Sequence, residues 1–80
     1  MKTVHVQYFA VLREQAGRGE ETLATDAHSA ADLYEALRGR HALTLPRSVL
    51  RVAVNEEFCS WDRPLHEGDR IVFIPPVAGG

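Results

Sequence analysis

The sequence has 80 residues, of which 45% are hydrophobic and 25% charged, and its formal net charge is −2. This length supports one small domain with a single core. The charge balance offers no broad basic surface for nucleic acid or an anionic membrane, and the apolar run at 71–80 is too short to span a bilayer. The start of the chain does not resemble a signal peptide. Because a lone cysteine, Cys59, excludes an internal disulfide, we expect a cytoplasmic protein.

The first 25 residues predict two strands separated by a short helical segment. Residues 2–9 alternate between apolar and mostly polar side chains, which is typical of a half-buried strand. Residues 10–16 suit a helix and stop at Gly17, so they predict one or two helical turns or a structured loop. Residues 20–25 predict a second strand, which would form a hairpin with the first.

A helix is predicted most clearly at residues 29–38. Ser29 is suited to cap its first turn, and Gly39 is suited to end it. Four apolar residues are spaced so as to form one buried stripe: Ala30, Leu33, Tyr34 and Leu37.

The second half of the chain predicts three further strands after a connection at 41–49. They are 50–54, a short strand at Phe58 and Cys59, and 70–74. The last is almost continuously apolar, so we expect it to be covered on both faces or to lie centrally, parallel to the first strand. The pattern predicts an α+β domain over 1–74, with one main helix on a mixed sheet of four to five strands. This is the layout of a β-grasp, or ubiquitin-like, fold.

The six residues at 75–80 form a distinctive ending: Pro75, Pro76, Val77, Ala78, Gly79 and Gly80. The prolines stop sheet pairing and favour a stiff, extended exit. Six extended residues reach roughly 20 Å, and the shrinking side chains would let this flexible tail enter a narrow tunnel with the Gly80 carboxylate at its tip. An inert, disordered terminus is the alternative.

A carboxylate must be activated before its oxygen can be displaced, most simply as an acyl-adenylate made from ATP. The sequence has no glycine-rich phosphate-binding loop. We therefore expect Gly80 to be the substrate of an adenylating partner.

Several other residues are candidates for docking. Phe9, Phe58 and Ile74 are the best candidates for an exposed apolar patch beside the tail, although each suits a core equally well. Arg13 suits either a docking surface or an ordinary exposed helix position.

The remaining reactive side chains form no recognisable site. Cys59 suits a small, half-buried strand residue better than a sulfur carrier. The four histidines lack the spacing of metal ligands, so we expect no metal site. The acidic residues are scattered as on a solvated surface, without a catalytic pair.

Four segments together resemble a known family. They are Tyr8-Phe9-Ala10-Val11-Leu12-Arg13-Glu14 with Gly17, Val52-Ala53-Val54-Asn55, Asp62 with Pro64-Leu65, and Gly68-Asp69 leading through Phe73-Ile74 to the diglycine. On these segments the sequence resembles the small subunits of molybdopterin synthase, which are ubiquitin-like sulfur carriers. Residues 40–50 match least.

The resemblance implies a cycle in which a ubiquitin-activating-type adenylyltransferase adenylates Gly80 and a persulfide source converts it to a thiocarboxylate. The tail would then enter the large synthase subunit and donate sulfur to cyclic pyranopterin monophosphate in molybdenum cofactor biosynthesis. The implied complex is a heterotetramer with its catalytic side chains on the large subunit. The small subunit then binds no cofactor of its own, and the segment 75–78 contacts the partner.

Three other functions stay open at this point. Sulfur carriers for thiamine thiazole or tRNA thiolation would have the same fold and ending. A ubiquitin-like modifier would join Gly80 to lysines. An interaction module with an inert tail would use neither chemistry.

Overall fold

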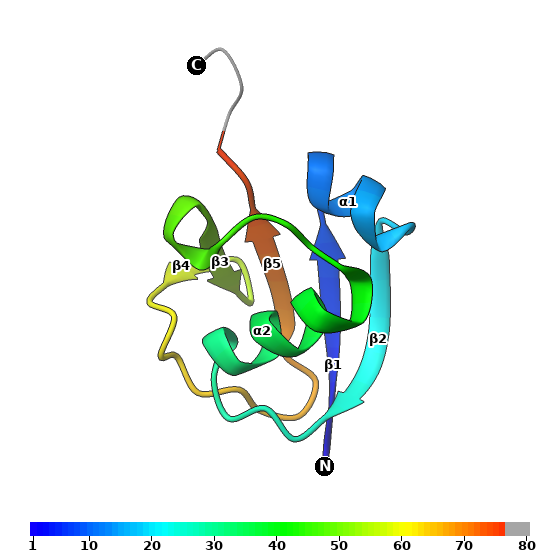
Figure 1. Ribbon diagram of the computed structural model, residues 1–80. Helices are drawn as coiled ribbons and strands as arrows, with labels where there is room; N and C mark the ends of the chain where they lie inside the picture. Colours follow the sequence, from blue (N-terminus) through cyan, green and yellow to red (C-terminus); the bar gives the residue numbers. More distant parts are fainter. Residues whose placement is uncertain (77–80) are drawn as a thin grey trace.

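The computed structural model describes residues 1–76, which form a five-stranded sheet with two α-helices (Figure 1). In chain order the elements are β1 Lys2–Tyr8, α1 Ala10–Ala16, β2 Glu20–Thr25, α2 Ala30–His41, the 3-10 turn η1 Arg47–Val49, β3 Arg51–Val54, β4 Glu57–Cys59 and β5 Arg70–Ile74. No helix among the described residues is long and apolar enough to cross a membrane.

The sheet has the strand order β2-β1-β5-β3-β4. β5 is parallel to β1, with Tyr8 opposite Phe73, and antiparallel to β3, with Arg51 opposite Ile74. β1 and β2 form the expected antiparallel pair. The mixed sheet and the central position of the last strand are therefore confirmed. β5 is not covered on both faces, because Ile71 and Phe73 are buried whereas Val72 is only half-buried.

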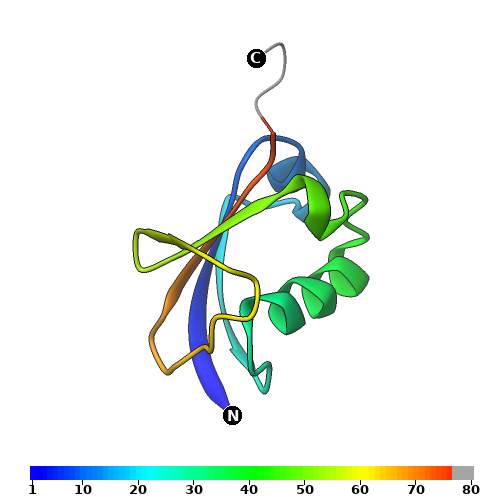
Figure 2. The same ribbon diagram turned by 90° about the vertical axis from the view of Figure 1, so that its left-hand side faces the viewer.

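Both helices cover the same side of the sheet, and the opposite side is open (Figure 2). The core between the layers joins the buried positions of the strands to Leu12 of α1 and to the stripe of α2. Tyr34 contacts Phe73 edge-on with ring centroids 5.1 Å apart, and Trp61 stacks on Phe73 at 5.9 Å. This aromatic group fixes α2 over the strand from which the tail leaves.

α2 begins as predicted but ends three residues later than predicted. The Ser29 hydroxyl accepts a hydrogen bond from the Asp32 backbone N–H at 3.2 Å, as an N-cap should. Gly39 was expected to end the helix, and this prediction is wrong. Instead Ala42 adopts the left-handed conformation and donates its N–H to the Arg38 carbonyl. The extra turn allows His41 to reach a buried carboxylate on β2.

The short connections were predicted more accurately. Gly17 ends α1 in the left-handed conformation, with φ of 76°. Asn55 and Glu56 form the two-residue turn between β3 and β4, both with positive φ. Gly68 has φ of 82° in the turn before β5. The connection at 41–49 contains η1, which the sequence did not predict.

Candidate docking face and tail exit

The open side of the sheet carries an apolar surface on the central strand β5 and its neighbours, which we call the docking face. Because strand side chains alternate, Val72 and Ile74 must point to the side opposite the buried Ile71 and Phe73. Pairing places Ala53 between Val72 on β5 and Phe58 on β4. The docking face therefore consists of Phe9, Ala53, Phe58, Val72 and Ile74, together with Arg51.

The three predicted patch residues share this face but differ in exposure. Phe58 is 61% exposed and Phe9 is 43% exposed, whereas Ile74 is half-buried. Phe9 follows the Tyr8–Phe73 pair with an extended backbone, which places it next to Ile74. Phe58 lies farther out, on the edge strand β4.

Arg51 joins the two ends of the docking face. It pairs with Ile74 across the sheet, and its guanidinium carbon lies 4.7 Å from the centroid of the Phe58 ring. A guanidinium over an aromatic face is a favourable cation–π contact. The docking face thus combines exposed apolar rings with one fixed positive charge.

Arg13 lies on α1 beside this face and is exposed. It lines a shallow depression together with Phe9 and Gly19. The Arg13 side chain lies close to the Gly19 backbone, since a Cβ added to Gly19 would be 3.4 Å from the Arg13 Nε. The Arg13 side chain therefore lies near the end of β1, and its exposure fits either prediction.

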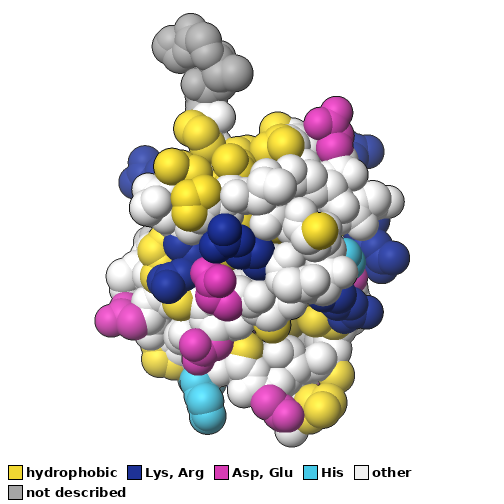
Figure 3. Space-filling model, in the orientation of Figure 1, with side chains coloured by type: hydrophobic (Ala, Val, Ile, Leu, Met, Phe, Trp, Pro, Cys, Tyr) yellow, Lys and Arg dark blue, Asp and Glu magenta, His cyan; other side chains and the backbone are white. Residues whose placement is uncertain are grey.

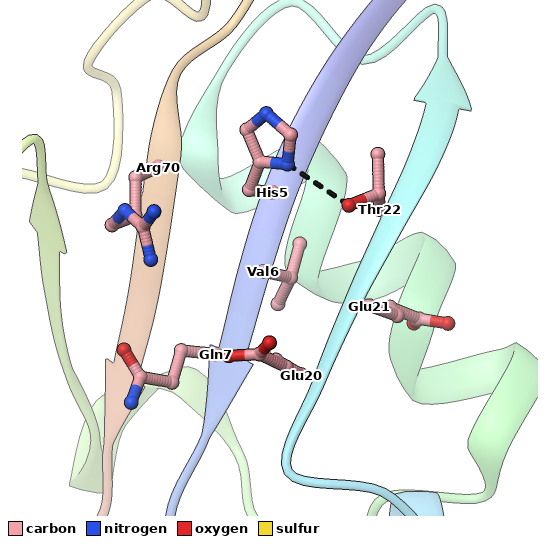
Figure 4. A pocket seen from close by; sticks show the side chains of 7 residues that line it. All are labelled: His5, Val6, Gln7, Glu20, Glu21, Thr22 and Arg70. Atoms are coloured by element: carbon pink, nitrogen blue, oxygen red, sulfur yellow. Dashed lines mark hydrogen bonds between the residues drawn. The ribbon is translucent and has the colours of Figure 1, made fainter.

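A separate, polar depression lies on the open side, near the start of β5 (Figure 4). His5, Gln7 and Arg70 line it, and the His5 Nδ1 lies 2.9 Å from the Thr22 hydroxyl. In the part of the chain that the structure describes, no three His, Cys, Asp or Glu side chains gather as a metal site. The depression borders the docking face, because Gln7 lies opposite Val72 in the sheet.

The helix side also presents apolar surface near the tail exit. Figure 3 shows hydrophobic side chains gathered next to the start of the segment drawn in grey. Val49 of η1 is 44% exposed, and Pro76 is exposed while Pro75 is half-buried. The expected partner-binding residues Val77 and Ala78 and the expected reactive residues Gly79 and Gly80 lie outside the described residues.

One polar network is buried, contrary to the expectation that the acidic residues are all on a solvated surface. The Glu21 side chain on β2 is 4% exposed, and it accepts hydrogen bonds from the Tyr8 hydroxyl at 2.6 Å and from His41 Nε2 at 2.9 Å. The Arg18 guanidinium adds an ion pair at 3.3 Å. The alternation of β2 could have predicted the burial of Glu21, because Glu21 lies on the same face of the strand as Leu23, which packs against the core.

The electrostatics of this network favour a charged carboxylate. Burial alone would raise the pKa of the Glu21 carboxyl, but the hydrogen bonds from Tyr8 and His41, together with the nearby charges of His41 and Arg40, lower it below its ordinary value. Burial, reinforced by the bond to Glu21, raises the pKa of the Tyr8 hydroxyl. The network therefore links β1, β2 and the end of α2 by a buried anion.

Asp69 is the second buried acid that the sequence reasoning missed. Its carboxylate accepts hydrogen bonds from the Asn55 side chain at 2.9 Å and from the His66 backbone at 2.8 Å. These bonds lower the pKa of the Asp69 carboxyl against the opposing effect of burial. Asp69 thus connects the turn before β5 to the β3–β4 turn. Both turns adjoin strands that carry residues of the docking face.

Cys59 is a half-buried residue of β4, as predicted. Its thiol lies 3.9 Å from the Val52 carbonyl oxygen and packs against the core.

Comparison with known proteins decides the family. The model of the ThiS family matches residues 6–80 of this chain. The chain belongs to the ThiS family. The molybdopterin synthase sulfur carrier subunit of Escherichia coli is 38% identical over 80 residues, which cover 96% of this chain and 99% of that protein.

Two solved structures place the ThiS-family chain among β-grasp proteins. Small archaeal modifier protein 1 from Haloferax volcanii aligns with a TM-score of 0.79 at 26% identity, covering 98% of this chain and 99% of that one. A chain of the complex of subunits 1 and 2 of molybdopterin-converting factor from Helicobacter pylori aligns with a TM-score of 0.68 at 25% identity, covering 98% of this chain and 99% of that one. The predicted fold and family are confirmed.

Proposed function

We propose that this protein is the sulfur carrier subunit of a molybdopterin synthase and that the Gly80 carboxylate carries the sulfur as a thiocarboxylate. The observation that carries the proposal is the 38% identity to the Escherichia coli sulfur carrier subunit over nearly the full length of both chains. The ThiS family match spans residues 6–80 and therefore includes both the docking face and the ending.

The geometry supports a chain end that is delivered to a partner. β5 lies at the centre of the sheet and is paired on both sides, so its end at Ile74, directly before Pro75, has a defined place in the fold. That point adjoins the docking face, with Phe9 and Ile74 beside it and Phe58 farther out. A partner that covers this face would therefore have the start of the tail directed into it.

The proposed partner on the docking face is the large synthase subunit, in a heterotetramer with two copies of each chain. Exposed Phe58 supplies an apolar ring and Arg51 a charge that suits a carboxylate on the partner. A ubiquitin-activating-type adenylyltransferase would use the same tail earlier in the cycle, and Arg13 is proposed to contribute to either surface. We propose no cofactor for this chain.

The chemistry follows from the inertness of a carboxylate. Attack of a Gly80 oxygen on the α-phosphate of ATP gives an acyl-adenylate and releases pyrophosphate. A persulfide sulfur then displaces AMP at the acyl carbon, and reductive cleavage of the resulting S–S bond by a thiol leaves the thiocarboxylate. Within the large subunit this sulfur is transferred to cyclic pyranopterin monophosphate. No catalytic side chain is required of this chain.

The test reconstitutes sulfur transfer with the large subunit and cyclic pyranopterin monophosphate, using thiocarboxylated protein. Wild type should support molybdopterin formation. A variant lacking Gly80, or Gly79→Val, should not, while its urea unfolding stays unchanged. Full activity of the variant lacking Gly80 would contradict the proposal.

A modifier function is the alternative that this experiment must separate, because small archaeal modifier protein 1 has the same fold. Conjugation would yield adducts of whole-protein mass on other proteins. Carriers for thiamine thiazole or tRNA thiolation would form the thiocarboxylate without supporting molybdopterin formation.

A further inference from the structure

The distribution of primary amines determines which groups of this chain could attack an activated Gly80. Lys2 is the only lysine in the sequence, and every other permanently charged basic side chain is an arginine. An acyl-adenylate or thioester is attacked readily by an amine, whereas a guanidinium remains protonated and is a poor nucleophile. The choice of arginine therefore removes nearly every self-acylation site from the surface.

Lys2 begins β1 next to the N-terminus, which lies at the end of the molecule opposite the end of β5 (Figure 1). Tyr8 pairs with Phe73, so Lys2 is seven strand positions from Ile74, or about 23 Å at about 3.3 Å per residue. Residues 75–80 span at most about 20 Å when fully extended. They would also have to reverse direction at two prolines of fixed φ. In addition, the Lys2 Nζ is held against the Ala27 carbonyl, beyond the end of β2 that lies away from the tail exit, so attack on Gly80 by Lys2 of the same chain is disfavoured.

The amines at that end are also engaged. The Lys2 Nζ donates a hydrogen bond to the Ala27 carbonyl at 2.7 Å, and its side chain is half-buried. The α-amino group of Met1 lies 3.6 Å from an Asp26 carboxylate oxygen. The Lys2 contact opposes the approach of another chain's acyl group, whereas the exposed Met1–Asp26 ion pair holds the α-amino group only weakly.

Resting on the proposed function, we propose that this arrangement protects the activated carrier from acylating itself. The reaction avoided is attack of an amine nitrogen on the Gly80 acyl carbon, in which the C–N bond forms, the bond to sulfur or phosphate breaks, and the amine proton passes to solvent. The activated end then persists until sulfur displaces the leaving group. A carrier protected in this way also does not build chains of itself.

The experiment uses the full chain with Gly80 as a mercaptoethanesulfonate thioester, prepared by intein cleavage and incubated at about 10 μM. Wild type should hydrolyse to the free acid without forming an internal amide or a covalent dimer. Arg51→Lys keeps the charge and puts an amine opposite Ile74, where an amine tethered within reach acts at about millimolar effective concentration. We therefore expect its internal amide, lighter than the acid by one water, to form about a hundredfold faster than any dimer.

Val49→Lys provides a second variant near the strand end, and urea unfolding checks that each variant is folded. Amide formation at Lys2 in wild type, at a rate like that of the variants, would overturn the proposal. So would the absence of an internal amide in both folded variants. Because the thioester is made without any activating enzyme, failure here leaves the sulfur-carrier proposal standing, and failure of sulfur transfer leaves this result unchanged.

Discussion

The buried Glu21 network makes the sharpest stability prediction. Glu21→Gln keeps the size and one acceptor oxygen but removes the charge that Tyr8 and His41 stabilise. Hydrogen bonds to a buried charged group contribute about 1.5–3 kcal/mol, and the half-exposed Arg18 adds little because solvent screens it. We therefore expect a loss of about 2 kcal/mol in the free energy of unfolding, or about 8–16 °C in Tm for a domain of this size.

The assay is urea unfolding at pH 7, with Glu20→Gln as a matched control. Glu20 is the preceding residue on the same strand but is exposed, so its substitution should change the free energy of unfolding by less than about 0.5 kcal/mol. Equal stabilities of the two variants, with equal m-values, would refute the claim that Glu21 is a buried, stabilising anion.

The network also has a pH dependence with a defined sign. The folded pKa values of Glu21 and Asp69 lie below their ordinary values, so both residues contribute stability above those ordinary values. This contribution should be lost as pH falls from about 4.5 through the lower folded pKa values. Glu21→Gln should flatten that loss. A variant with the same acid sensitivity as wild type would show that Glu21 does not titrate in this way.

Three further variants test the packing and the docking face. Gly39→Ala should stabilise the protein by about 0.5–1 kcal/mol, because Gly39 lies within α2 and an added Cβ would meet no other atom. Gly17→Ala should destabilise it by about 1 kcal/mol, because Gly17 has a positive φ. Thermal unfolding of the two variants gives the sign of each change. Phe73→Ala should cost about 3–5 kcal/mol in urea unfolding, since Phe73 is fully buried in the aromatic group under α2. Phe58→Ser should weaken binding of the large subunit, measured by calorimetry, at least about tenfold. Its urea unfolding should be nearly unchanged, because the ring is mostly exposed. An unchanged affinity would show that Phe58 is not part of the interface.

Much of the fold was predictable because local patterns and tertiary structure agree. The alternation at 2–9, the stripe on α2 and the apolar run at 70–74 each matched the observed element. The end of α2 was not predictable from Gly39. Glycine is tolerated inside a helix at modest cost, and the side chains beyond it are fixed by tertiary contacts such as that of His41 with Glu21.

The candidate site, too, was predictable only in part. The alternation of β1 indicated that Phe9 faces away from the core, and the position of Ile74 before two prolines marked it as a tail neighbour. The pairing that puts Ala53 between Phe58 and Val72, and Arg51 beside Ile74, depends on which strands are neighbours and in what register. Strand order and register between distant segments are set by the whole fold, so the docking face became visible only in three dimensions.

The central claim is tested most directly by the intact mass of the protein after incubation with its activating enzyme, ATP and a persulfide source. The account predicts a species heavier than the starting protein by the difference between sulfur and oxygen, with the change located at Gly80 by fragmentation. A mass that never changes, or a sulfur located at Cys59 instead, would contradict it.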